Sequence, residues 1–87
     1  MSKIWMAEVH IYMGNEEMIT LGAFDSEEKA NDAMFRFKDE LKRNVEEFSS
    51  STDEDTEETL YSWSCDLGFY EEYYNGIVYP LELNKYR

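Results

Sequence analysis

The sequence predicts an α+β domain in which one antiparallel sheet carries a single long helix on one face. Three observations support this fold. Apolar residues alternate with others over 3–13, which is typical of a strand. They recur at spacings of three and four over 26–48, which indicates an amphipathic helix. Alternation returns in 59–69 and 77–83, so the expected order of elements is β-β-α-β-β.

The first strand separates its side chains onto two faces. We expect the core face to hold Trp5, Ala7, Val9, Ile11 and Met13. The opposite face holds Ile4, Met6, Glu8, His10 and Tyr12. A turn at 14–17 leads into a second strand over 18–24, and so short a connection makes 4–24 an antiparallel hairpin.

The helix is expected to begin at a polar run. Asp25 as N-cap with Glu28 three residues later forms a capping box, and acids in the first turn suit the helix dipole. The apolar stripe that follows consists of Ala30, Ala33, Met34, Phe37, Leu41, Val45 and Phe48. The same segment contains five bases and three acids that can pair with them, namely Lys29, Arg36, Lys38, Lys42 and Arg43 with Asp32, Asp39 and Glu40. Its charge is therefore close to neutral.

The segment 49–58 has no apolar residue, and we expect it to form a mobile acidic loop inside a single domain spanning 1–87. A third strand with an aromatic face follows at 59–69. The segment 71–76 is expected to be a connection.

The connection would turn at Asn75-Gly76, a frequent hairpin dipeptide. The fourth strand, 77–83, contains Pro80, which cannot donate a ladder hydrogen bond. We therefore expect this strand at an edge of the sheet or with a bulge.

Length and composition set limits on the class of protein. A chain of 87 residues and 10.4 kDa supports one domain, and 43% hydrophobic with 16% aromatic residues excludes disorder of the whole chain. No apolar run approaches the roughly 18 residues of a membrane span, and residues 1–3 do not begin a signal peptide. The single cysteine, Cys65, forms no internal disulfide. These features predict a cytoplasmic protein.

The run Gly22-Ala23-Phe24-Asp25-Ser26-Glu27-Glu28-Lys29-Ala30 resembles the strand-to-helix junction of short, functionally uncharacterised domains of bacteria and their phages, approximately Gly-x-Phe-x-Ser-x-Glu-Lys-Ala. The ending Tyr79-Pro80-Leu81-Glu82-Leu83 is similar as well. The resemblance covers 4–45 and 77–84 and implies a leading hairpin, a helix and a closing strand. It implies no activity.

Negative charge dominates the second half of the chain. Twenty Asp and Glu against eight Lys and Arg give a net charge of −12 and a pI near 4.3. Residues 44–84 carry eleven of the acids and no base. Such a protein repels nucleic acid and anionic membranes, so we expect it to bind neither directly.

The residues that carry enzyme or metal chemistry are sparse. A nucleophile needs an adjacent base, and Cys65 with His10 is the single conceivable pair; a small buried cysteine and a strand histidine are the simpler interpretation. One cysteine and one histidine are too few for zinc. The acids from 53 to 58 follow a calcium loop in part, but Glu58 stands where glycine is needed. We expect no enzyme, no cofactor and no designed metal site.

Acids and tyrosines occur together between 46 and 76. Tyrosine supplies large contact area at low entropic cost, and acids spaced by about 6–7 Å resemble the phosphates of a nucleic-acid strand. The candidate partner-binding residues are Glu46, Glu47, Asp53, Glu54, Asp55, Glu57, Glu58, Asp66, Tyr70, Glu71, Glu72, Tyr73 and Tyr74.

Two hypotheses follow from this combination. In the first, the chain is a small non-enzymatic inhibitor that binds a basic nucleic-acid-binding protein, such as a nuclease, by mimicking nucleic acid. By analogy with other small acidic phage proteins, the setting would be anti-restriction or anti-CRISPR defence. The alternative is a general protein–protein interaction domain or homodimer without a nucleic-acid-related partner, formed through strand edges or the tyrosines.

Overall fold

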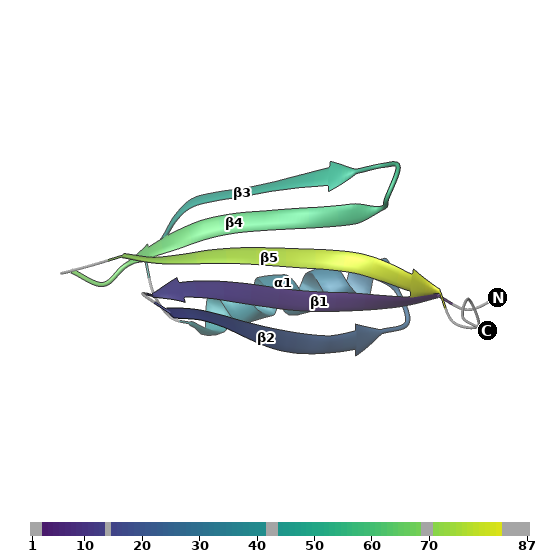
Figure 1. Cartoon of the computed structure of the whole chain (residues 1–87), viewed down its shortest axis with the longest axis horizontal. Helices are drawn as coiled ribbons and strands as arrows, with labels where there is room; N and C mark the ends of the chain where they lie inside the picture. The colour runs from purple at the N-terminus through teal and green to yellow at the C-terminus, as the bar shows by residue number, and fades with distance from the viewer. Residues whose placement is uncertain (1–2, 14, 42–43, 69–70, 83–87) are drawn as a thin grey trace.

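The protein is a five-stranded antiparallel sheet with one helix (Figure 1). The computed structural model describes residues 3–13, 15–41, 44–68 and 71–82. The elements are β1 (Lys3–Met13), β2 (Asn15–Phe24), α1 (Glu27–Glu40), β3 (Val45–Asp53), β4 (Glu58–Asp66) and β5 (Glu71–Glu82). The strand order across the sheet is β2-β1-β5-β4-β3, so β2 and β3 are its edges.

The β1–β2 hairpin confirms the antiparallel pair expected from the sequence. Its register runs from Trp5 opposite Phe24 to Met13 opposite Asn15. The turn expected at 14–17 is therefore wrong over 15–17, because β2 already begins at Asn15; Gly14 lies outside the described residues. The ladder shifts between Ala7 and Glu8, opposite Gly22 with a φ of 150°, a conformation that favours glycine.

Helix α1 begins close to the expected residue but with a different cap. The hydroxyl of Ser26, not Asp25, accepts the Lys29 backbone N–H at 3.2 Å. Asp25 instead pairs with the Lys29 side chain at 3.0 Å. The helix ends at Glu40, eight residues before the expected end at Phe48. Lys42 and Arg43, expected in the helix, lie outside the described residues.

The apolar spacing that extended the predicted helix arises from a β-bulge. Val45 and Phe48 both pack against the core, although they are three residues apart in β3. The ladder with β4 shifts between Glu46 and Ser49, and Glu47 adopts a φ of 56°. This extra residue returns Phe48 to the core face, so a bulged strand reproduces a helical spacing.

A β-hairpin replaces most of the acidic loop expected at 49–58. Residues 49–53 belong to β3, and the turn is limited to 54–57 between Asp53 and Glu58. The Glu57 backbone N–H donates to the Asp53 carbonyl at 2.7 Å and closes the turn. An edge strand exposed on much of its surface needs few apolar residues, which explains why the serines form a strand without the usual alternation.

The connection expected at 71–76 is also wrong, since these residues begin the central strand β5. Gly76 lies within the strand because helix α1 approaches it closely. A Cβ atom there would be 2.6 Å from the Met34 sulfur. The edge position expected for the strand that contains Pro80 is wrong, because β5 lies between β1 and β4. Pro80 lies two residues beyond Val78, the last β5 residue paired with β4, so the missing N–H interrupts no described pairing with β4.

The core lies between the sheet and α1. The expected core face of β1 is confirmed for Trp5, Ala7, Val9 and Ile11. Ala30 and Met34 of the helix are fully buried, and the Trp63 ring stacks on Tyr74 at 5.2 Å. The helix contacts the sheet less extensively than the strands contact one another.

Candidate functional site

The sheet face opposite the core, called the open face below, exposes large side chains. Leu60 is 51% exposed, Tyr73 53% and Leu81 48%, although all three belong to strands. The residues that share this face by register are Ile4, Met6, Glu8, His10, Tyr12, Glu16, Met18, Thr20, Ala23, Glu46, Ser49, Ser51, Asp53, Glu58, Leu60, Ser62, Ser64, Asp66, Glu71, Tyr73, Asn75, Ile77, Tyr79 and Leu81. Exposed apolar surface of this extent typically marks an interaction site.

The open face divides into rows that run across the strands. Leu60 pairs with Ile77, which pairs with Glu8, and Met6 pairs with Tyr79. The Tyr79 hydroxyl donates to Glu8 at 2.7 Å, and this hydrogen bond raises the pKa of Tyr79. This part of the face is therefore rich in apolar side chains, and the Glu8 carboxylate within it accepts a hydrogen bond from a tyrosine.

A tyrosine pair lies toward the other end of the open face. Tyr12 of β1 is directly opposite Tyr73 of β5. The Tyr73 hydroxyl donates to Glu71 at 2.8 Å, and this hydrogen bond raises the pKa of Tyr73. Nearby, His10 and Glu16 are 3.0 Å apart through Nδ1 and Oε2. Both tyrosines are exposed.

A shallow depression of about 290 Å³ separates these two parts of the face. Its open-face side chains are Ser49, Ser51, Leu60, Ser62 and Asn75, and it also contacts Ser50, Tyr61 and Gly76. The depression exists because the centre of β3, β4 and β5 carries small side chains between larger ones. It can receive one side chain of a binding partner.

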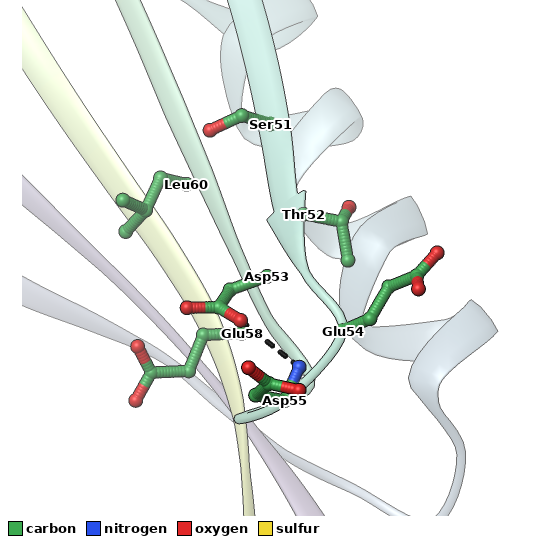
Figure 2. A pocket seen from close by; sticks show the side chains of 7 residues that line it. All are labelled: Ser51, Thr52, Asp53, Glu54, Asp55, Glu58 and Leu60. Carbon is green, nitrogen blue, oxygen red and sulfur yellow. Dashed lines mark hydrogen bonds between the residues drawn. The ribbon is translucent and has the colours of Figure 1, made fainter.

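The candidate acids of the β3–β4 hairpin gather at one end of the sheet. Figure 2 shows the carboxylates of Asp53 and Glu58 on the same side as Leu60, whereas Glu54 points away. Asp53 Oδ1 accepts the Asp55 backbone N–H at 2.9 Å, which holds the turn. Together with Ser51 and Thr52 they line a shallow depression of about 590 Å³.

The fifth acid of this end, Glu57, is paired. Its carboxylate is 2.8 Å from the Lys3 ammonium, and this hydrogen bond raises the pKa of Lys3. The contact joins the start of β1 to the β3–β4 turn.

The remaining candidates separate into exposed and buried residues. Glu46, Glu47, Asp66, Glu71 and Tyr73 are exposed at the end of the sheet opposite the hairpin turn. Glu72 and Tyr74 alternate with them along β5 and are buried on the core face, 3% exposed each, with the Tyr74 hydroxyl donating to Glu72 at 2.6 Å. These two residues hold the core together and cannot meet a partner. Tyr70 lies outside the described residues.

Sequence reasoning missed Tyr12, Met18, Leu60 and Leu81 as surface residues. The alternation in 3–13 was the available signal, since it placed Tyr12 on a second face with Ile4 and Met6. That second face is exposed because α1 packs on the opposite face of the sheet.

Positive charge is separated from the open face. Strands β2 to β5 contain ten Asp and Glu and no Lys or Arg. Among the residues that the structure describes, the bases are Lys3 and three on α1, Lys29, Arg36 and Lys38. Among the described residues, the open face therefore presents tyrosine, leucine and carboxylate without Lys or Arg, because Lys3 lies on the other face of β1 by register.

The arrangement of potential reactive groups is unfavourable for the one nucleophile–base pair suggested by the sequence. Cys65 is fully buried on the core face of β4, whereas His10 lies on the open face of β1. The sheet separates the two side chains. Over 3–13, 15–41, 44–68 and 71–82, no group of three or more His, Cys, Asp or Glu side chains is placed to hold a metal ion.

Helix α1, the helix within the described residues, is too short and too polar to cross a membrane. Comparison of the chain with protein-family models, curated proteins and solved structures gave no match.

Proposed function

We propose that the protein is a non-enzymatic inhibitor that binds a basic nucleic-acid-binding protein through the open face and its two acidic ends. The observation that carries this proposal is the combination of exposed tyrosine and leucine with ten acids and no Lys or Arg in β2 to β5. A basic surface complements it in charge, and basic surfaces that bind phosphates are common in nucleic-acid-binding proteins.

The spacing of the acids supports a partner that normally binds a phosphate backbone. One group of carboxylates lies around Glu46 and the other around Asp53. These positions are seven residues apart in β3, roughly 20 Å at the rise of a strand. The two groups can contact separate parts of a protein groove that binds nucleic acid and is lined by Lys and Arg side chains. The exposed tyrosines and leucine between them supply contact area that phosphates do not have.

Charge also favours this partner over a second copy of the chain. Two open faces brought together would place their carboxylates near each other with few bases for compensation. Like-charge contacts of this kind cost affinity and slow association. Competition with nucleic acid for a basic partner would then be the source of inhibition.

The test uses a matched pair of charge variants of the tagged protein. Asp66→Asn with Glu71→Gln removes two charges beside the open face and keeps the oxygen atoms that accept from Gly68 and Tyr73. Asp32→Asn with Glu40→Gln removes two charges from exposed positions of α1. Proteins retained from a host-type lysate at about 50 and about 300 mM salt are identified and purified, and displacement of a DNA duplex from each is then measured.

We expect a nucleic-acid-binding protein that releases DNA when the wild-type chain is added, with affinity falling steeply at the higher salt. The open-face variant should bind about tenfold more weakly, and the helix variant within about threefold of wild type. Retention of a partner equally at both salts, without displacement of DNA, would contradict the proposal. So would equal losses in the two variants.

A further inference from the structure

We propose that the 290 Å³ depression on the open face holds an arginine side chain of the basic partner. This inference rests on the proposed function, because it names the residue type through which that partner would be recognised. It depends on three properties of the depression: its row of polar groups, its walls and the absence of a carboxylate from its lining.

The floor of the depression is a row of hydrogen-bonding side chains across neighbouring strands. Ser49 pairs with Ser62, Ser62 pairs with Asn75, and Asn75 pairs with His10. Neighbouring strands are about 4.8 Å apart, so these groups form a regular line. The hydroxyls of Ser49 and Ser62 and the Asn75 amide make no hydrogen bond with any other described residue.

A guanidinium is the cation that this row accommodates best. It presents five N–H donors in a planar fork, whereas the row offers several oxygen acceptors in one line. Each acceptor is exposed to solvent, and so an arginine replaces water contacts without leaving a buried group unpaired. One side chain can therefore contact Ser62 and Asn75 together.

The walls of the depression suit the rest of an arginine side chain. Leu60, 51% exposed, provides apolar surface for the methylene groups. Tyr73 is outside the residues that line the depression, two residues from Asn75 on the same face of β5, and is 53% exposed. Its ring is available for stacking with a guanidinium, and its hydroxyl is directed to Glu71.

Lysine gains less from the same site. An ammonium is strongly hydrated and binds best as a point charge next to a carboxylate. No carboxylate is among the eight residues that line the depression, all of which are described. The acids at both ends of the sheet attract lysine and arginine alike, so a preference for arginine reports on the depression itself.

The experiment compares fluorescently labelled nona-arginine and nona-lysine peptides by anisotropy at about 100 mM salt. We expect the wild-type protein to bind the arginine peptide about tenfold more tightly than the lysine peptide. Ser62→Leu fills the depression from an exposed position, and it should reduce this preference to about twofold or less. Thr20→Leu makes the same kind of change on the same face outside the depression and should preserve the preference.

A second variant and a spectroscopic readout protect the test against misfolding. Ser49→Leu fills the depression from the edge strand and should reduce the preference as Ser62→Leu does. In amide NMR spectra of the wild type, the arginine peptide should shift Ser62 and Asn75 more than the lysine peptide does. Native-like spectra of the variants exclude loss of the fold.

The outcomes separate the two proposals. Equal affinity for both peptides, or an arginine preference that survives both leucine variants, overturns the arginine site and leaves charge-driven binding intact. Failure of both peptides to bind even at about 20 mM salt, where screening is weak, overturns the binding of basic partners and the arginine site with it.

Discussion

Gly76 determines how closely the helix approaches the sheet. The residue is buried in the central strand, opposite Val9 on one side and Tyr61 on the other. Met34 of α1 occupies the space above it, and a Cβ would meet the methionine sulfur at 2.6 Å and its methyl group at 2.9 Å. Because Met34 is itself fully buried, it has little room to move aside.

We therefore expect Gly76→Ala to lower the free energy of unfolding by about 1–3 kcal/mol in urea titrations, through overpacking. Combining it with Met34→Ala, which empties the occupied space, should give a loss smaller than the sum of the single losses by about 1 kcal/mol. Asn75→Ala at the exposed neighbouring position should change stability by less than about 0.5 kcal/mol. Strict additivity of the Gly76 and Met34 losses would contradict this account.

The bulge in β3 is the main irregularity at the scale of elements. Glu47 and Phe48 together oppose Trp63 in β4, and Phe48 packs on its indole ring at 5.8 Å. Lys38 of α1 lies over the Phe48 ring at 5.0 Å, which connects the helix to this edge of the sheet. The positive φ of Glu47 is the conformational cost of placing Phe48 on the core face.

This cost predicts a difference between two substitutions at one position. Glu47→Gly should be more stable to urea than Glu47→Gln by about 0.5–1 kcal/mol, because glycine adopts the φ of 56° without strain and both variants lose the same charge. Glu46 precedes the bulge and lacks a positive φ, so Glu46→Gly should be less stable than Glu46→Gln. If the glycine variant were less stable than the glutamine variant at both positions, the bulge would carry no strain at Glu47.

The elements that could be predicted from sequence are those formed by local pattern. The β1–β2 hairpin and the start of α1 followed from alternation and from a polar capping run. The end of α1 could not be predicted, because Val45 and Phe48 have a helical spacing that depends on pairing with β4. Asn75-Gly76 resembles a turn in local sequence for a similar reason, because the helix packed over the glycine is distant in sequence.

The candidate site was predictable in its charge and less so in its shape. The acids of the hairpin turn lie at the surface as expected, and Tyr73 is exposed. Tyr74 was indistinguishable from Tyr73 in sequence until the register of β5 was known, and Glu72 likewise differs from Glu71 by burial alone. The row of polar side chains from Ser49 of β3 to His10 of β1 could be predicted only with the strand order, which local sequence does not encode.

At the scale of the whole molecule, the fold is elongated and strongly charged. Its extents are 49 × 23 × 22 Å, and its radius of gyration of 14.1 Å exceeds the roughly 12 Å expected for a compact domain of this length. Long strands and a single helix account for this shape (Figure 1). A net charge of −12 on such a body opposes folding by self-repulsion.

Salt should therefore stabilise the isolated protein while it weakens the proposed complex. We expect the free energy of unfolding in urea to rise by about 1 kcal/mol between about 20 and 200 mM NaCl, because screening reduces repulsion among the carboxylates. A variant with Glu54→Gln and Asp55→Asn, which reduces the charge at the hairpin turn, should show a smaller rise. A free energy of unfolding that does not change with salt would show that repulsion among the carboxylates does not destabilise the folded protein.

The free edge at β3 has a consequence for self-assembly. Unpaired strands can add to one another without limit and grow into fibres. If two β3 strands met in antiparallel register centred between Ser49 and Ser50, Glu46 of each copy would lie opposite Asp53 of the other. Repulsion between these carboxylates at both ends of the strand thus opposes polymerisation through the β3 edge.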